Sequence, residues 1–249
     1  MSSLEYGEST EPIDLSDASF DWFGDRDLPD DTYHNTRLVR LAYDLSWTRF
    51  RAEMTYGILK SESSDPTILS SLLSQLHSLD IRLDEWFDGL PEEWWPSVMT
   101  TQPREDVWNS VVHVFSDRLL ADMFDMAAVM RIIIHERILD ISFQLGQSTP
   151  AESTYAIQNA ADSICGSIPW LFGSDALGAA NPALGKQFLD PLAWCRGGLV
   201  ICMKWIPWPA HCSSCVPEAQ RRWLKERLEY AGRATTSAQA ATLAQQIEI

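Results

Sequence analysis

The sequence is short of positive charge. Its 249 residues include 19 Lys and Arg against 35 Asp and Glu, which gives a formal net charge of −16. The densest basic stretch, residues 221–227, is interrupted by Glu226 and flanked by Glu218 and Glu229. Proteins bind the phosphate backbone largely through clustered lysines and arginines. We therefore expect no direct contact with nucleic acid and no attraction to an anionic membrane surface.

Long apolar runs are scarce as well. The longest apolar-rich stretch, residues 197–210, contains Lys204 and two prolines and is shorter than the ~18 residues typical of a membrane span. Residues 1–31 are polar and acidic, unlike a secretory signal. All five cysteines lie beyond residue 164, without framework spacing, which suits a reducing compartment. We expect an intracellular protein, in the nucleus or the cytoplasm, with no membrane partner.

Familiar catalytic and cofactor motifs are missing. The chain has no glycine-rich phosphate loop, no Gly-x-Ser-x-Gly turn, no His-Glu-x-x-His pair and no Glu-x-x-His pair. His211, Cys212 and Cys215 form the best metal-like cluster. A closed zinc site needs four ligands, however, and only Cys202 and the distant His135 are further candidates. We expect free thiols there, and no catalytic residue, metal or cofactor; one equivalent of zinc in the purified protein would overturn this.

What the sequence does contain is a helical pattern in almost every segment after residue 33. The clearest stripe follows Asp65 and Pro66, an expected N-cap and first helical residue, and repeats leucine every three or four residues from Leu69 to Leu83. Further helices are predicted over 34–60, 105–145, 151–167, 190–205, 218–232 and 236–247, with Pro169 ending the one over 151–167. The predicted fold class is all-α: an irregular multi-helix bundle or α-solenoid-like single domain over 34–249.

An acidic segment, expected to be flexible, precedes this domain at residues 1–33. It carries ten acids, all before residue 32, and Phe20, Trp22 and Phe23 lie among them. Acidic residues mixed with aromatic ones are typical of a disordered activation segment. They equally fit a solvated tail whose aromatic side chains dock on the domain, and the sequence does not choose between the two.

Polar residues within the long predicted helix are the first candidates for a binding site. Arg131 and His135 are four residues apart, so they share a helix face, and they lie beside a run of isoleucines. An arginine drawn toward a core needs a partner, which here is either an internal carboxylate or an anionic effector. His113 and Asp117 have the same spacing, and we interpret them as a solvated or locally paired polar face.

Tryptophans in the C-terminal third are the second group of candidates. Aromatic side chains often line ligand pockets, so Trp194 and Trp205 join Arg131 and His135 as the predicted ligand-binding residues. Packing within the core is the simpler interpretation of these tryptophans.

Four segments, in order along the chain, are similar to elements of one family. They are LDIRLDEWFDGLPEEWWP at 79–96, LLADMFDMAAVMRIIIHERILD at 119–140, ICGSIPWLFG at 164–173, and a closing region at 198–244 with Trp205-Ile206-Pro207 and Gln220-Arg221-Arg222-Trp223-Leu224. Over about 35–245 the chain resembles the fungal-specific transcription factor domain, which follows the zinc binuclear cluster in many fungal regulators. The six cysteines of that cluster are absent from residues 1–34, so DNA binding is not implied.

The resemblance implies a transcription-regulatory domain that acts through a protein partner or a small-molecule effector, and a homodimer is compatible with it. The alternative function is an enzyme or ligand-binding protein of fungal secondary metabolism built on the same helices, because fold alone does not determine function. A deep cavity on which Arg131 and His135 converge would favour this alternative. A third interpretation is that an upstream DNA-binding region is missing from this sequence.

Overall fold

Helices form most of the chain that the structure describes. The structure, a computed structural model, describes residues 32–59, 66–173, 204–211, 215–235 and 238–247. The α-helices within these ranges are α1 (Thr32–Leu59), α2 (Pro66–Asp88), α3 (Arg118–Gln144), α4 (Ala151–Leu171), α8 (Pro207–His211), α9 (Glu218–Thr235) and α10 (Ala238–Gln246). The all-α class is confirmed. The predictions for residues 1–31, for Asp65 and for the helix at 190–203 lie outside the described residues.

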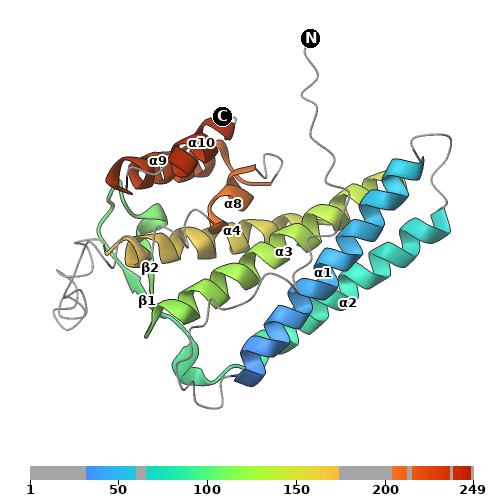
Figure 1. The fold of residues 1–249 in the computed structure, drawn as a ribbon, viewed down its shortest axis with the longest axis horizontal. Coiled ribbons are helices and arrows are strands. Elements are labelled where there is room, and N and C mark those ends of the chain that lie inside the picture. The colour runs from blue at the N-terminus through green and yellow to red at the C-terminus, as the bar shows by residue number, and fades with distance from the viewer. Residues whose placement is uncertain (1–31, 60–65, 174–203, 212–214, 236–237, 248–249) are drawn as a thin grey trace, which may run out of the picture.

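Four long helices form the body of the molecule. In Figure 1, α1 and α2 lie side by side next to α3, and α4 packs against α3. Helices α9 and α10 pack against each other near the C-terminus. The leucine stripe of α2 is buried, as predicted. One contiguous cluster of buried side chains extends from Leu38 in α1 to Ile247 beyond α10. Each large apolar side chain buried in it contributes ~1.5–3 kcal/mol, so this core holds the helices in place.

A β-hairpin replaces the first part of a predicted helix. Residues 105–117 contain no α-helix: strand β2 (Val111–Val114) pairs antiparallel with β1 (Ser97–Thr100). Asn109 and Ser110 have φ values of 49° and 59°, left-handed conformations that interrupt a helix. The prediction was wrong because repeated valines also suit a strand, where β-branched side chains pack well. The 3-10 turns η1 (Glu92–Trp94) and η2 (Trp108–Ser110) precede the two strands.

His113 and Asp117 therefore do not share a helix face, which corrects the sequence-based interpretation. His113 lies in β2, where burial lowers the pKa of its imidazole and a hydrogen bond to the backbone of Ser163 partly opposes the shift. Asp117 is the N-cap of α3, and its carboxylate accepts a hydrogen bond from the Leu120 N–H at 3.0 Å. The long helix starts at Arg118 because this cap satisfies one of its free N–H groups.

Pro169 does not end α4, contrary to expectation. The helix continues through it to Leu171, and Gly173 follows with a φ of 65°. A proline inside a helix costs ~3 kcal/mol. Ile168, Trp170 and Leu171 are fully buried, however, and each contributes ~1.5–3 kcal/mol of burial. Packing of the last turn therefore outweighs the lost backbone hydrogen bond.

A buried polar network joins α9 to α4. The Gln220 amide donates to Asp162 Oδ1 at 3.0 Å, and the same oxygen accepts from Trp108 Nε1 at 2.9 Å. Gln158 Nε2 donates to Gln220 Oε1 at 2.8 Å. Gln220 Nε2 also lies 3.3 Å from the sulfur of Cys165, whose thiol pKa is raised by burial. The network gives the Gln220–Leu224 motif a structural role, because it fixes the start of α9 on α4.

Candidate functional site

A cleft between α2, α3 and α4 is the main candidate for a binding site. Its volume is about 340 Å³, within the range of ~300–1,000 Å³ that small-molecule sites occupy. Its lining comprises Asp80, Asp84, Phe87, Phe124, Ala128, Arg131, His135, Glu152, Tyr155, Ala156, Asn159, Ala160 and Ser163. We call this space the α2–α3–α4 cleft. Two of the four predicted ligand-binding residues, Arg131 and His135, thus line one cleft.

Arg131 is neutralised by two carboxylates of α2. Its Nη2 donates a hydrogen bond to Asp84 Oδ1, and its Nε lies 3.6 Å from Asp80 Oδ1. Its guanidinium carbon is 5.4 Å from the centre of the Phe87 ring, a cation–π distance. Asp80 and Asp84 reach the same arginine because residues four apart share a helix face. Of the two partners considered for Arg131, the structure supplies the internal carboxylate.

His135 connects α2 with α4. Its Nε2 lies 3.3 Å from Asp80 Oδ1, and its Nδ1 lies 3.1 Å from Ser153 Oγ. Burial tends to raise the pKa of Asp80, but the hydrogen bond to His135 and the nearby charges of His135, Arg131 and His77 outweigh burial and lower it. Asp80 is therefore ionised at neutral pH. This carboxylate is the shared partner that holds Arg131 and His135 together.

The Asp80–His135–Ser153 series has the connectivity of a hydrolase triad without the necessary access. In such a triad the serine oxygen attacks a bound substrate. Ser153 is 2% exposed and does not belong to the lining of the cleft. A nucleophile has to reach the reacting atom, and the Ser153 hydroxyl is enclosed. The arrangement orients His135 and does not support covalent catalysis.

Trp205 belongs to the core and not to the cleft. It is 7% exposed, and its Nε1 donates a hydrogen bond of 2.6 Å to Asp122 Oδ1. Asp122 precedes Arg131 on α3 by about two and a half helical turns, so the two side chains point to opposite sides of the helix. The structure therefore separates Trp205 from Arg131 and His135. Trp194, the fourth predicted residue, lies outside the described residues.

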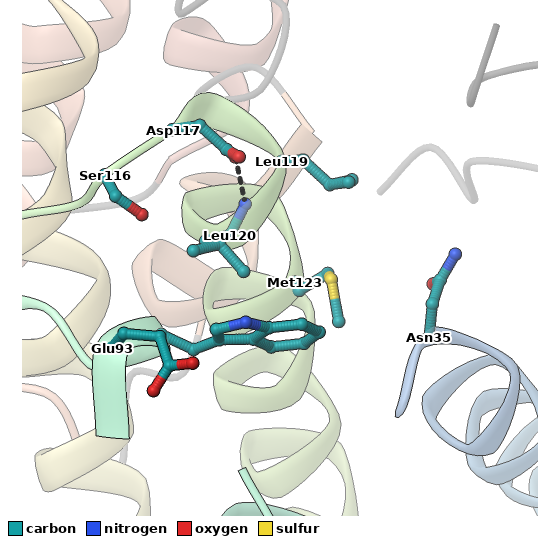
Figure 2. A pocket seen from close by; sticks show the side chains of 8 residues that line it. Asn35, Glu93, Ser116, Asp117, Leu119, Leu120 and Met123 are labelled. Atoms are coloured by element: carbon teal, nitrogen blue, oxygen red, sulfur yellow. Dashed lines mark hydrogen bonds between the residues drawn. The ribbon is translucent and has the colours of Figure 1, made fainter. Parts of the chain in front are cut away.

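A second cavity, of about 250 Å³, lies at the start of α3. Figure 2 shows Asp117 turned toward the backbone of Leu120, with Asn35 at the start of α1 across the gap. A helix N-terminus attracts anions in general, but here the Asp117 carboxylate occupies that position. Glu93 adds a second carboxylate to the lining. An anionic ligand would be repelled, and this cavity is the weaker candidate.

Within the described ranges, no three His, Cys, Asp or Glu side chains are grouped so that they could hold a metal ion. Cys202 and Cys212 lie outside those ranges, so the predicted cluster around His211 is not placed. Among the helices that the structure describes, none has the length and apolar character needed to cross a membrane.

The residues that α2 and α4 contribute to the cleft are not among those predicted from the sequence. Asp80 and Asp84 offered a signal, because they repeat four residues apart among the leucines of α2. Glu152, Tyr155 and Asn159 are spaced by three and four residues near the start of α4 and so share a helix face, but nothing in the sequence placed that face against α3. Their shared location follows only from the packing of α4 against α3.

Comparison with known proteins adds no relative: no family model, no curated protein and no solved structure matches this chain. The resemblance to the fungal-specific transcription factor domain therefore stays a prediction, carried by the four segments named above.

Proposed function

We propose that this chain is a transcription-regulatory domain that responds to a small-molecule effector bound in the α2–α3–α4 cleft. The observation that carries the proposal is the convergence of charged side chains from three helices on one open space: Asp80 from α2, Arg131 from α3 and Glu152 from α4. Groups of this kind that are held at a hollow, rather than packed away, are typical of a binding site. The acidic composition of the chain supports regulation without direct DNA contact.

The cleft is well placed to transmit a binding event. Its walls belong to α2 and α4, which lie on either side of α3 and are linked through Asp80, His135 and Ser153. A ligand that binds one spacing of these helices more tightly shifts the population toward that spacing. Movement of α4 would act on α9, because Asp162 and Gln158 of α4 bond to Gln220. The C-terminal helices are thus the output that we expect an effector to alter.

A reporter assay tests this function. The whole chain is fused to an unrelated DNA-binding domain and expressed with a reporter gene that carries the matching sites. We expect the fusion to change reporter output several-fold relative to the DNA-binding domain alone, and Arg131→Ala to alter that output. Arg137→Ala is the matched control, because Arg137 lies on the same helix and pairs with Asp140 at 3.1 Å outside the cleft. An inert fusion, or sub-micromolar binding of the isolated chain to generic duplex at physiological salt, would refute the proposal.

A ligand-binding protein without a transcriptional output is the second candidate. It is favoured by one observation, that Arg131 and His135 both line the cleft, as this alternative anticipates. The enzymatic form of the alternative has less support because the Ser153 hydroxyl is buried. The reporter separates the two functions: ligand binding in the cleft combined with an inert fusion would favour the second.

A further inference from the structure

The α2–α3–α4 cleft has an unbalanced charge. Its lining includes three carboxylates, from Asp80, Asp84 and Glu152, and one guanidinium, from Arg131. The three carboxylates outnumber the single guanidinium by two, and they still outnumber the cations by one if His135 is counted as a cation. The effective dielectric constant of a cleft is lower than that of water, so such an excess favours a cation more strongly there than at an open surface.

Arg131 is not available to an anion. Its guanidinium already donates to Asp84, lies 3.6 Å from Asp80 and stacks over the Phe87 ring. A ligand carboxylate or phosphate that approached the remaining N–H groups of Arg131 would face the negative charges of Asp80 and Asp84. That repulsion costs free energy, and the two carboxylates already neutralise the guanidinium. The arginine therefore serves the fold of the cleft.

Glu152 is the carboxylate that remains without a counter-ion. It lies in the first turn of α4, and within the described part of the chain it has no hydrogen bond or ion pair. Unlike Asp80 and Asp84, it is free to accept hydrogen bonds from a bound ammonium group. Charge-assisted hydrogen bonds of this type are about twice as strong as neutral ones.

Aromatic and small side chains shape the rest of the cleft. Phe87 and Phe124 meet edge to face, with ring centres 5.7 Å apart, and Tyr155 is 69% exposed. Ala128 and Ala156 come from the facing helices α3 and α4, and their short side chains leave the space between them open. Aromatic faces attract cations and also cover the apolar part of a ligand. A hydrated metal ion would make no use of these walls.

We propose that the α2–α3–α4 cleft binds an organic amine in its ammonium form, joined to an aromatic or aliphatic body, with Glu152 as its counter-ion and Phe87 and Phe124 as its apolar walls. The inference rests on the proposed function, since it names the chemical class of the effector. It also makes a charge preference the decisive property of the site.

Three probes that share a phenethyl group and differ in the charge of the polar group attached to it test the inference: phenethylamine, phenethyl alcohol and phenylpropionate. Titrations of the full chain by calorimetry or ligand-detected NMR rank their affinities. We expect the amine to bind at least about tenfold more tightly than the anion, with the alcohol between them. Equal affinities, tightest binding of the anion, or no binding of the amine at millimolar concentration would overturn the inference.

Variants locate the binding. Glu152→Gln should weaken amine binding about fivefold, the value of one solvent-accessible charge pair, and leave the alcohol unchanged. Glu218→Gln is the matched control, because Glu218 is the first-turn acid of α9 and lies outside the cleft. Ala156→Leu should fill the cleft and remove binding of all three probes, with folding checked by circular dichroism. Equal losses from Glu152→Gln and Glu218→Gln would overturn the assignment.

The reporter fusion keeps the two proposals apart. A cleft without charge preference, combined with a reporter that still responds to Arg131→Ala, refutes the amine and retains the regulatory function. Selective amine binding combined with an inert fusion refutes the regulatory function and retains the amine.

Discussion

Asp80 and Asp125 are buried to different degrees near α3, and their pKa values shift in opposite directions. Asp125 is 2% exposed, and burial raises its pKa well above the ordinary value, although the hydrogen bond from Ser167 opposes the shift. The Asp80 side chain is 22% exposed, and its pKa is lowered because His135 and Arg131 outweigh burial. Partners and solvent access therefore decide the direction in which each pKa shifts.

The hydrogen bonds around Asp125 agree with a neutral acid. The Ser167 hydroxyl lies 2.8 Å from Asp125 Oδ2 and 2.9 Å from the Ile164 carbonyl oxygen. One hydroxyl has one proton and can donate to only one of them. If Asp125 is protonated, it donates to Ser167, which in turn donates to Ile164, and every group is satisfied. The polar groups around Asp125 thus bond to one another inside the core, whereas the charged groups of the α2–α3–α4 cleft stay accessible to a ligand.

Phe124 lies between the core around Asp125 and the α2–α3–α4 cleft, and replacing it should have the largest effect on stability. Its ring contacts those of Trp86, Phe87, Trp95 and Phe115, and it also lines the cleft. We expect Phe124→Ala to lower the free energy of unfolding by about 3–5 kcal/mol, measured by urea denaturation.

The control for this substitution is Phe143→Ala on the same helix. Phe143 is 82% exposed, so its removal should change stability by less than about 0.5 kcal/mol. Similar losses for both variants would mean that the boundary between core and cleft is not where the structure places it.

Replacing Arg131, the cation of the cleft, should have the next largest effect on stability. Arg131→Ala leaves Asp80 without its arginine and should cost about 2 kcal/mol at pH 7, less than a fully buried pair because both side chains are partly solvated. Asp80 has a lowered folded-state pKa, so its stabilising contribution is present above pH 3.8 and is lost as the pH falls through the folded value. The difference between wild type and variant should shrink over that range in urea titrations. A constant difference would contradict the role of Asp80.

For the buried carboxyl group of Asp125 we expect the reverse pH dependence of stability. Asp125 has a raised folded-state pKa, so its contribution is fully present below pH 3.8 and declines as the pH rises toward the folded value. Asp125→Asn stays neutral, so its stability relative to wild type should rise with pH by up to about 1.4 kcal/mol per unit. Thermal unfolding across pH 4–8 measures this, with Asp140→Asn as the exposed control. A stability difference between Asp125→Asn and wild type that did not change with pH would contradict the raised pKa of Asp125.

The smallest effect on folding is expected for Glu152. Because it is exposed and has no partner within the described chain, Glu152→Gln should change the free energy of unfolding by less than about 0.5 kcal/mol. The same substitution should reduce amine affinity, which separates a binding role from a folding role. A large loss of stability would instead make Glu152 part of the framework.

Local patterns were sufficient for most of the helices. The leucine stripe of α2 predicted its buried face, and the helix predicted from residue 151 is α4, because helical periodicity acts over a few residues. They failed at residues 105–117, where valines fit a helix or a strand equally well, and at Pro169, where burial of the flanking side chains outweighs a local rule.

The shared face of Arg131 and His135 was visible in their four-residue spacing, since that relation is internal to one helix. Their partners were not, because Asp80 and Ser153 come from α2 and α4, which are distant in sequence and meet α3 only when the core assembles. The same assembly raised the pKa of Asp125, lowered that of Asp80 and made Trp205 a core residue. Charge state and access depend on what surrounds a side chain in three dimensions, and no spacing along the chain specifies that.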